Sequence, residues 1–87
     1  MQDPTKIAEG ETLADLRGFR CPLPVLKTRV RLRALGPGAR LVVLTDDPLA
    51  GLDIPAFCNE SGQMLVAQEP LDGEAIRFTI ERGDGKL

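Results

Sequence analysis

The chain has 87 residues, 43% of them hydrophobic and 28% charged, with a net charge of −2, a composition that fits one small globular domain with a single core. Trp and Tyr are absent and only three Phe occur, so the aromatic side chains that stack on single-stranded bases are scarce. No stretch approaches the roughly 18 apolar residues that span a bilayer. We therefore expect a cytoplasmic protein that binds no membrane and makes no direct contact with nucleic acid.

The chain contains two cysteines and no histidine. Two thiols in a small cytoplasmic protein do not form a disulfide framework, and without histidine they cannot complete a four-ligand zinc site within one chain. The missing histidine also excludes a Cys–His nucleophile pair, so a reactive thiol must depend on a helix terminus or on Arg and Lys for its activation. We expect no metal site and no cofactor.

The first half of the chain predicts a tail, a strand and a helix. Residues 1–11 are polar and aperiodic and are interpreted as a flexible tail. Residues 12–16 predict a short strand, and Gly18 allows the turn after it. Residues 22–35 predict a helix that Gly36-Pro37-Gly38 ends. Its apolar side chains form two opposite stripes, and we expect one to face a sheet and the other to pack on a second helix or a partner. The stripes are Leu23, Leu26, Val30 and Ala34 on one side, and Val25, Leu32 and Leu35 on the other.

The middle of the chain predicts a buried strand and a second helix. Residues 41–44 are a continuous β-branched and leucine-rich run, which is typical of a central strand. Asp53 is a candidate N-cap for a helix over residues 53–61, and Gly62 is positioned to end it.

The last third predicts a hairpin. Residues 64–68 and 75–81 alternate between apolar and polar side chains and flank a turn, and residues 83–87 are interpreted as a C-terminal tail. The order βαβαββ predicts an α/β (α+β) two-layer sandwich over residues 12–82, with a four-stranded mixed sheet and both helices on one face.

The candidate reactive residue is Cys21, which opens the tetrapeptide Cys21-Pro22-Leu23-Pro24. Proline costs little in the first turn of a helix, where backbone N–H groups have no intrahelical partner, so the motif places Cys21 at the N-cap. The positive end of the helix favours the nucleophilic thiolate there, and Arg17, Arg20 and Lys27 should act in the same direction. We therefore expect the pKa of Cys21 to lie below that of an ordinary thiol.

Basic residues dominate the segment around Cys21, since no Asp or Glu lies between Leu16 and Thr45. Two interpretations are open: solvated flanks of a helix, or a basic docking surface beside the thiol. The candidate partner-binding residues of that surface are Arg17, Leu23, Lys27, Arg29 and Arg33.

Three further polar residues are interpreted structurally. Cys58, within the second helix, is taken as an inert and partly buried thiol, the alternative being a resolving thiol or a second sulfur site. Asp46 and Asp47 follow the central strand and are taken as cap or turn residues, the alternative being an edge that a partner recognises.

Three elements of the chain resemble those of the TusA/SirA-like sulfur-carrier family. They are the stretch from Asp15 to Pro24 with its Cys-Pro-x-Pro motif, then Asp46-Asp47-Pro48, then Asp53-Ile54-Pro55-Ala56-Phe57-Cys58. The resemblance implies a small α/β sandwich in which Cys21 accepts sulfane sulfur as a persulfide and passes it to a downstream protein. It also implies sulfurtransferase-type chemistry without a bound cofactor, supported by Gly18, Arg20, Pro22 and Pro24 of the motif.

Members of that family usually receive sulfur from a pyridoxal-phosphate-dependent cysteine desulfurase. Some serve 2-thiolation of the tRNA wobble uridine, and others serve molybdenum-cofactor or sulfur-oxidation pathways. The resemblance thus implies a donor protein and an acceptor protein as partners. A hypothesis of another class is a regulatory or interaction module in which Cys21 senses redox state. The basic charge beside the cysteine and the lack of an aromatic nucleic-acid surface favour the carrier.

Overall fold

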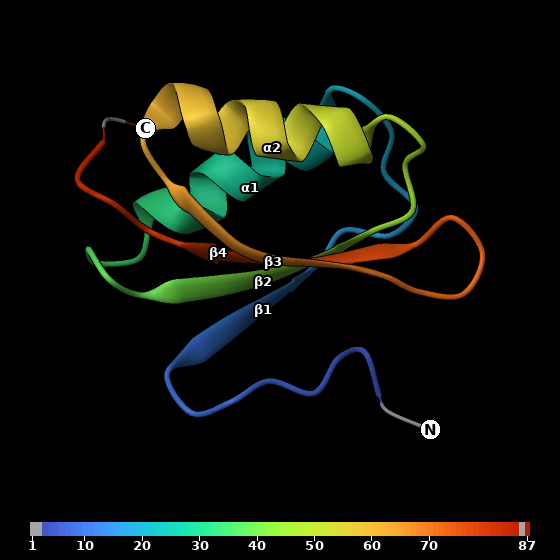
Figure 1. Ribbon diagram of the computed structural model, residues 1–87, viewed down its shortest axis with the longest axis horizontal. Coiled ribbons are helices and arrows are strands. Elements are labelled where there is room, and N and C mark those ends of the chain that lie inside the picture. Colours follow the sequence, from blue (N-terminus) through green and yellow to red (C-terminus); the bar gives the residue numbers. More distant parts are fainter. Residues whose placement is uncertain (1–2, 86) are drawn as a thin grey trace.

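A computed structural model describes residues 3–85 and 87, and its helices and strands follow the order βαβαββ (Figure 1). The elements are β1 (Glu11–Asp15), α1 (Leu23–Arg33), β2 (Arg40–Thr45), α2 (Ala50–Ser61), β3 (Met64–Pro70) and β4 (Ile76–Glu81).

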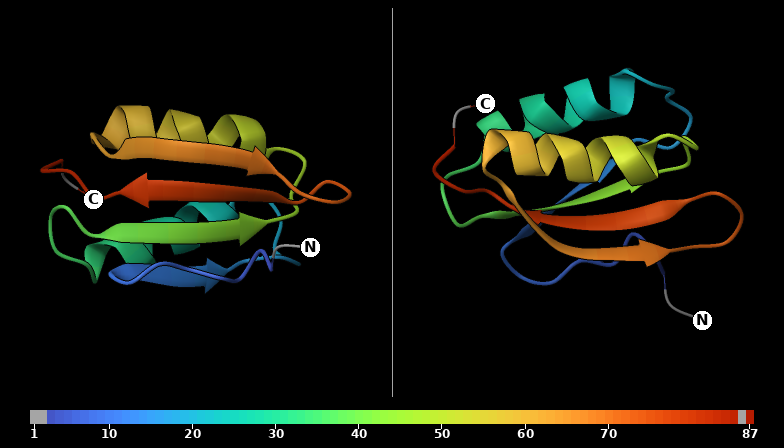
Figure 2. Two further views of the ribbon diagram at one scale, coloured as in Figure 1. Left: turned by 60° about the horizontal axis from the view of Figure 1, so that its bottom comes forward. Right: turned by 45° about the horizontal axis from the view of Figure 1, so that its top comes forward.

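The strands form one four-stranded mixed sheet in the order β1-β2-β4-β3. β1 and β2 are parallel, whereas β4 runs antiparallel to both β2 and β3. Both helices lie on one side of this sheet in Figure 1 and in the two views of Figure 2. The predicted two-layer sandwich with its helices on one face is confirmed.

The core lies between the sheet and the helices. Alternate side chains of a strand point to opposite faces of the sheet, so every second residue of β2 and β4 contributes to it. In the middle of both strands these side chains are fully buried, and so are Leu32 and Ile54 of the helices that pack against them. The central core residues are Leu41 and Val43 of β2, Phe78 and Ile80 of β4, Leu32 of α1 and Ile54 of α2.

The two apolar stripes of α1 lie in different environments. Leu32 is buried in the core, and Val25 and Leu35 pack against it, so this stripe faces the sheet as expected. The opposite stripe is exposed instead of packing on the second helix. Its members Leu23, Leu26 and Val30 are 43%, 48% and 62% exposed.

The second helix begins at Ala50, earlier than the predicted start at Asp53. The backbone carbonyl of Asp47 accepts the Ala50 N–H at 3.0 Å, and the Asp47 carboxylate accepts the Leu49 N–H at 3.3 Å. Asp47 therefore supports the first turn, and Leu49 occupies the N-cap position. Asp53 lies within that first turn, and its carboxylate is available for another contact.

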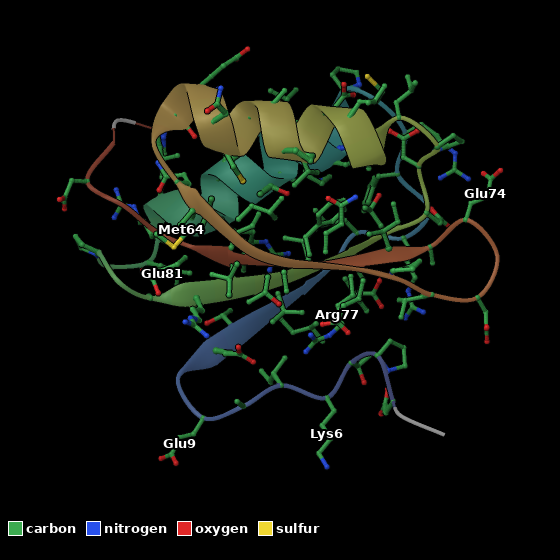
Figure 3. All side chains as sticks on the ribbon, in the orientation of Figure 1. Lys6, Glu9, Met64, Glu74, Arg77 and Glu81 are labelled. Atoms are coloured by element: carbon green, nitrogen blue, oxygen red, sulfur yellow. The ribbon has the colours of Figure 1, made fainter. Side chains whose placement is uncertain are left out.

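The N-terminal segment crosses the face of the sheet that the helices leave open. Arg77 of β4 donates from Nε to the Pro4 carbonyl at 3.2 Å and from Nη2 to the Lys6 carbonyl at 2.9 Å. Figure 3 shows Arg77 and Lys6 on this side of the sheet. The domain limits at residues 12 and 82, with tails on either side, stay a prediction.

Gly62 ends α2 in the left-handed conformation, with φ 75°. Because a Cβ is disfavoured there, we expect Gly62→Ala to lower the free energy of unfolding by about 1–2 kcal/mol. Denaturant unfolding measures this. Gly36→Ala is the matched control, since a Cβ at Gly36 meets nothing within 4 Å and its φ is not positive. Equal stability of the two variants would contradict the argument.

Candidate functional site

The loop that carries Cys21 is tied to the end of β2. Asp46 follows that strand, and its Oδ1 accepts the Gly18 N–H at 2.9 Å and a hydrogen bond from Arg20 Nη1 at 2.7 Å. Gly18 has φ +95°, a conformation that L-residues with a Cβ rarely adopt. The path of the chain into Cys21 therefore depends on a glycine and on a carboxylate from a distant part of the sequence.

Cys21 lies just outside α1 and not at its N-cap, which corrects the sequence-based placement. The helix begins at Leu23, and Pro22 occupies the N-cap position without a side-chain cap. The Leu23 N–H donates to the Arg20 carbonyl at 2.9 Å, so the chain turns before the helix starts. Because the field of a helix terminus falls off within one turn, this offset weakens its hold on the thiolate.

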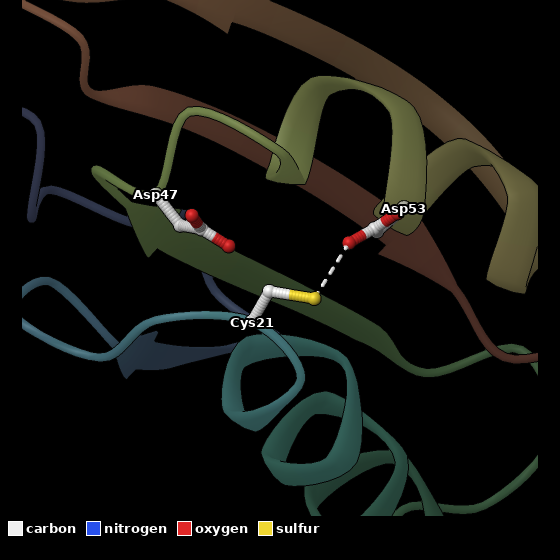
Figure 4. Close-up of side chains that lie close together, drawn as sticks. All are labelled: Cys21, Asp47 and Asp53. Carbon is white, nitrogen blue, oxygen red and sulfur yellow. Dashed lines mark hydrogen bonds between the residues drawn. The ribbon is translucent and has the colours of Figure 1, made fainter.

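The exposed Cys21 thiol donates a hydrogen bond to a carboxylate of α2. Its Sγ lies 3.3 Å from Oδ2 of Asp53 (Figure 4). Asp47, only 4% exposed, is close by, and Sγ and a carboxylate oxygen of each acid lie within 4.8 Å of one another. Acidic groups cluster in this way without an ion. Nothing else in residues 3–85 and 87 points to a metal, so we assign none.

The acids raise the pKa of Cys21, contrary to the expected lowering. The hydrogen bond to Asp53 is the largest cause, and partial loss of water around the sulfur and the negative charges of Asp53 and Asp47 act in the same direction. Each of these effects favours the neutral thiol over the thiolate. The surroundings of Cys21 therefore do not activate its thiol.

The basic residues expected to stabilise the thiolate are engaged elsewhere. The observed pairs are Arg17 with Asp15 at 2.7 Å, Arg20 with Asp46 at 2.7 Å, and Lys27 over the ring of Phe19 at 4.5 Å. A cation matched by a neighbouring anion contributes little at a distance, so Arg17 and Arg20 do not offset the acids beside the sulfur.

An open pocket of about 320 Å³ lies beside Cys21, between the two helices. Arg29 reaches it from α1, with its guanidinium carbon 5.4 Å from the centre of the Phe57 ring. The buried Nε of Arg29 has no hydrogen-bond partner among the described residues. The pocket is lined by Cys21, Pro22, Val25, Arg29, Asp53, Ala56, Phe57 and Glu60. It thus combines an apolar floor with one cation and two acids.

A family model described as sulfurtransferase TusA matches residues 9–82. The chain belongs to the TusA sulfurtransferase family. The crystal structure of a SirA-like protein from Desulfitobacterium hafniense is similar to it, with a TM-score of 0.73, 26% sequence identity, and coverage of 84% of this chain and 99% of that chain. The resemblance carried by the Cys-Pro-x-Pro segment is thereby confirmed. Membership of the TusA family supports a sulfur-carrier or sulfurtransferase role with protein partners.

The second thiol of this TusA family member is buried. Cys58 is 2% exposed, and burial raises its pKa to about 11. Such a thiol is almost wholly protonated at neutral pH and cannot be reached by a partner's sulfur. This agrees with the interpretation of Cys58 as inert.

The remaining motif and partner-binding candidates lie at different distances from the thiol. Pro24 is buried in the first turn of α1, and its carbonyl accepts the Thr28 hydroxyl at 2.7 Å. Leu23 is exposed next to Cys21. Arg33, at the far end of α1, donates from Nε and Nη2 to the Leu87 carbonyl at 3.0 and 2.7 Å, away from the thiol.

Sequence reasoning missed Asp53 as a member of the site. Its position before a helical stretch containing Pro55 indicated an N-cap, and no spacing rule relates it to Cys21, which is 32 positions away. The only available signal was its place in the TusA-like element Asp53-Ile54-Pro55.

No helix among the described residues has the length and apolar character needed to cross a membrane.

Removing the Asp46 carboxylate should loosen the loop that leads into Cys21. In Asp46→Ala we expect the exchange rate of the Gly18 amide hydrogen to rise severalfold, because that N–H loses its acceptor while the core is untouched. Amide exchange followed by NMR measures it. Asp72→Ala, in the exposed hairpin turn, removes the same charge and should leave Gly18 unaffected. Unaltered Gly18 exchange in Asp46→Ala would refute this role.

Proposed function

We propose that the chain is a sulfur carrier that accepts sulfane sulfur as a persulfide on Cys21 and relays it to a downstream acceptor. The observation that carries this proposal is the exposed thiol of a TusA family member in a Cys-Pro-x-Pro segment, held at the surface by a fixed loop. Sulfur transfer requires two sulfur atoms to come within bonding distance, so the receiving thiol must be accessible. Cys21 meets this requirement and Cys58 does not.

The proposed partners are a cysteine desulfurase or another sulfur donor, and a separate acceptor protein. The acceptor would belong to a pathway such as tRNA 2-thiouridine formation, molybdenum-cofactor synthesis or sulfur oxidation, as the TusA resemblance implies. A redox sensor is a weaker fit, because sensor cysteines have a low pKa and often a resolving thiol nearby. Here the pKa of Cys21 is raised and Cys58 is buried.

Sulfur loading should require Cys21 and not Cys58. After incubation with a cysteine desulfurase, cysteine and pyridoxal phosphate, intact mass should show a gain of one sulfur atom in the wild type. We expect Cys21→Ser to lose this gain and Cys58→Ala to keep it. Alanine is chosen at position 58 because a hydroxyl there would be buried. Loading of Cys21→Ser at the wild-type level would rule out the proposed carrier site.

The exposed stripe of α1 next to Cys21 is the proposed docking surface for these partners. Leu26 and Val30 of this stripe, with Lys27 and Arg31, line a groove of about 210 Å³. Exposed apolar side chains supply contact area, and the two cations supply long-range attraction for an acidic partner surface. Of the sequence-based candidates, Leu23 and Lys27 belong to this surface. Arg17 is paired, and Arg33 is tied to the C-terminus.

Reversing the charge of Lys27 should slow encounter with the donor. For Lys27→Glu we expect the association rate with a cysteine desulfurase to fall severalfold at low ionic strength, with a smaller difference at high salt. Lys6→Glu is the control, since Lys6 lies on the opposite side of the sheet (Figure 3). Stopped-flow or biosensor rates decide it. Equal rates for both variants would place docking elsewhere.

A further inference from the structure

Asp53 is the described side chain that hydrogen-bonds the reacting sulfur, with Oδ2 3.3 Å from Cys21 Sγ. With Asp53 ionised, its carboxylate can only accept, and the sulfur carries the proton of this hydrogen bond. We propose that Asp53 is a catalytic residue of the carrier: it holds Cys21 as a protonated thiol between transfers and takes that proton when a donor persulfide is attacked. The inference rests on the proposed function, and it assigns the control of the protonation of Cys21 to a residue of α2.

The charged groups beside Cys21 and in the pocket next to it come from three elements. α2 contributes Asp53 and Glu60, the turn between β2 and α2 contributes Asp47, and α1 contributes Arg29. Three acids thus oppose one guanidinium, which itself lies over the Phe57 ring. A thiolate at Sγ would lie close to the Asp53 carboxylate with like charge, whereas the thiol gains a hydrogen bond there. The surroundings agree with a resting thiol.

The loading step balances with Asp53 as the proton carrier. The donor is a protein persulfide in its protonated form, and Cys21 Sγ attacks its outer sulfur. The Sγ–H bond and the donor's S–S bond break, and a new S–S bond forms on Cys21. The electron pair of the broken S–S bond goes to the donor's inner sulfur, and the proton passes from Sγ through Asp53 Oδ2 to that sulfur. The products are the Cys21 persulfide and the donor thiol, with no net oxidation or reduction.

A protonated resting state would protect an exposed sulfur. Oxidation of cysteine to sulfenic acid and beyond proceeds from the thiolate and increases with exposure. Cys21 is exposed and has no resolving thiol within reach, since Cys58 is buried. Withholding the thiolate until a donor is aligned limits such losses, and a carboxylate in contact with Sγ can do this without closing the site.

The resting state is tested by alkylation of Cys21 with iodoacetamide over a range of pH, in a Cys58→Ala background so that one thiol reacts. We expect Asp53→Asn to shift the midpoint of the pH–rate profile downward and to raise the rate at neutral pH severalfold, because more of Cys21 is then present as the reactive thiolate. Asp72→Asn removes an equal charge from the hairpin turn and should match the parent. A midpoint in Asp53→Asn equal to that of Asp72→Asn would overturn the proposal.

The proton-transfer role is tested by the rate of loading from glutathione persulfide, a donor that needs no protein docking. For Asp53→Asn we expect loading at neutral pH to fall by about a hundredfold, the lower end of the range for loss of a positioned base, although alkylation is faster. A variant that loads and alkylates faster in parallel would show that Asp53 only suppresses the thiolate, which would also overturn the proposal.

The hydrogen bond between Cys21 and Asp53 can also be tested without an Asp53 variant. The S–H stretching band of Cys21, recorded by infrared spectroscopy in the Cys58→Ala protein, should lie at lower frequency than that of free cysteine because of the hydrogen bond to Asp53. An unshifted band would count against the inference. The proposed function fails separately, through loading that persists in Cys21→Ser, so the two failures are distinguishable.

Discussion

The parallel pairing of β1 with β2 is the constraint on which the site depends. Parallel strands present their carboxyl ends at the same edge of a sheet, and here Asp15 is in register with Leu44. The loop toward α1 and the turn toward α2 therefore start beside each other, and both helices begin at this edge. Cys21 and Asp53, which are 32 positions apart in the sequence, meet for that reason. Sites in open α/β sheets form at this edge in general.

Within this frame, the pairing of charges decides the chemistry of the thiol. A segment of the chain without acids surrounds Cys21 in the sequence, yet carboxylate oxygens of Asp53 and Asp47 lie within 4.8 Å of its sulfur. The two arginines before Cys21 form ion pairs with acids outside this segment. Arg17 pairs with Asp15 at the end of β1, and Arg20 pairs with Asp46, which follows β2. A basic segment is therefore compatible with an acidic site, and the direction of the pKa of Cys21 follows from the contacts and not from the composition.

The fold was predictable because the apolar residues of most strands and of α1 repeat with the spacing of their own secondary structure. Alternation placed Phe78 and Ile80 in the core, and the helical stripe containing Leu32 marked the face of α1 that meets the sheet. Gly62 ended α2 where the sequence placed it. The start of α2 was not predictable in this way, because Asp47 and Asp53 are both plausible caps and the choice depends on how the turn leaves β2.

The site was only partly predictable, for a related reason. Cys21 could be found because its Cys-Pro-x-Pro motif is local, and Gly18 because a glycine before a turn has a local meaning. The neighbours of Cys21 depend on the parallel pairing of β1 and β2. This pairing brings Asp47 and Asp53, which follow β2, to the sulfur in the loop that follows β1. Local patterns contain no information on which side chains meet across the fold, so the expected lowering of the pKa of Cys21 was wrong, although the motif that carries the thiol could be recognised.

These acids also suggest how docking and activation are linked in a carrier of the proposed kind. Asp53 and Glu60 line an open pocket, so their charges are accessible to a bound protein. A partner that places a cation against them would reduce the repulsion that a thiolate at Cys21 experiences. The same contact would contribute to encounter, because opposite charges steer association. In such a carrier, activation of the thiol would coincide with arrival of the donor, and an exposed sulfur would stay unreactive between transfers without a moving lid.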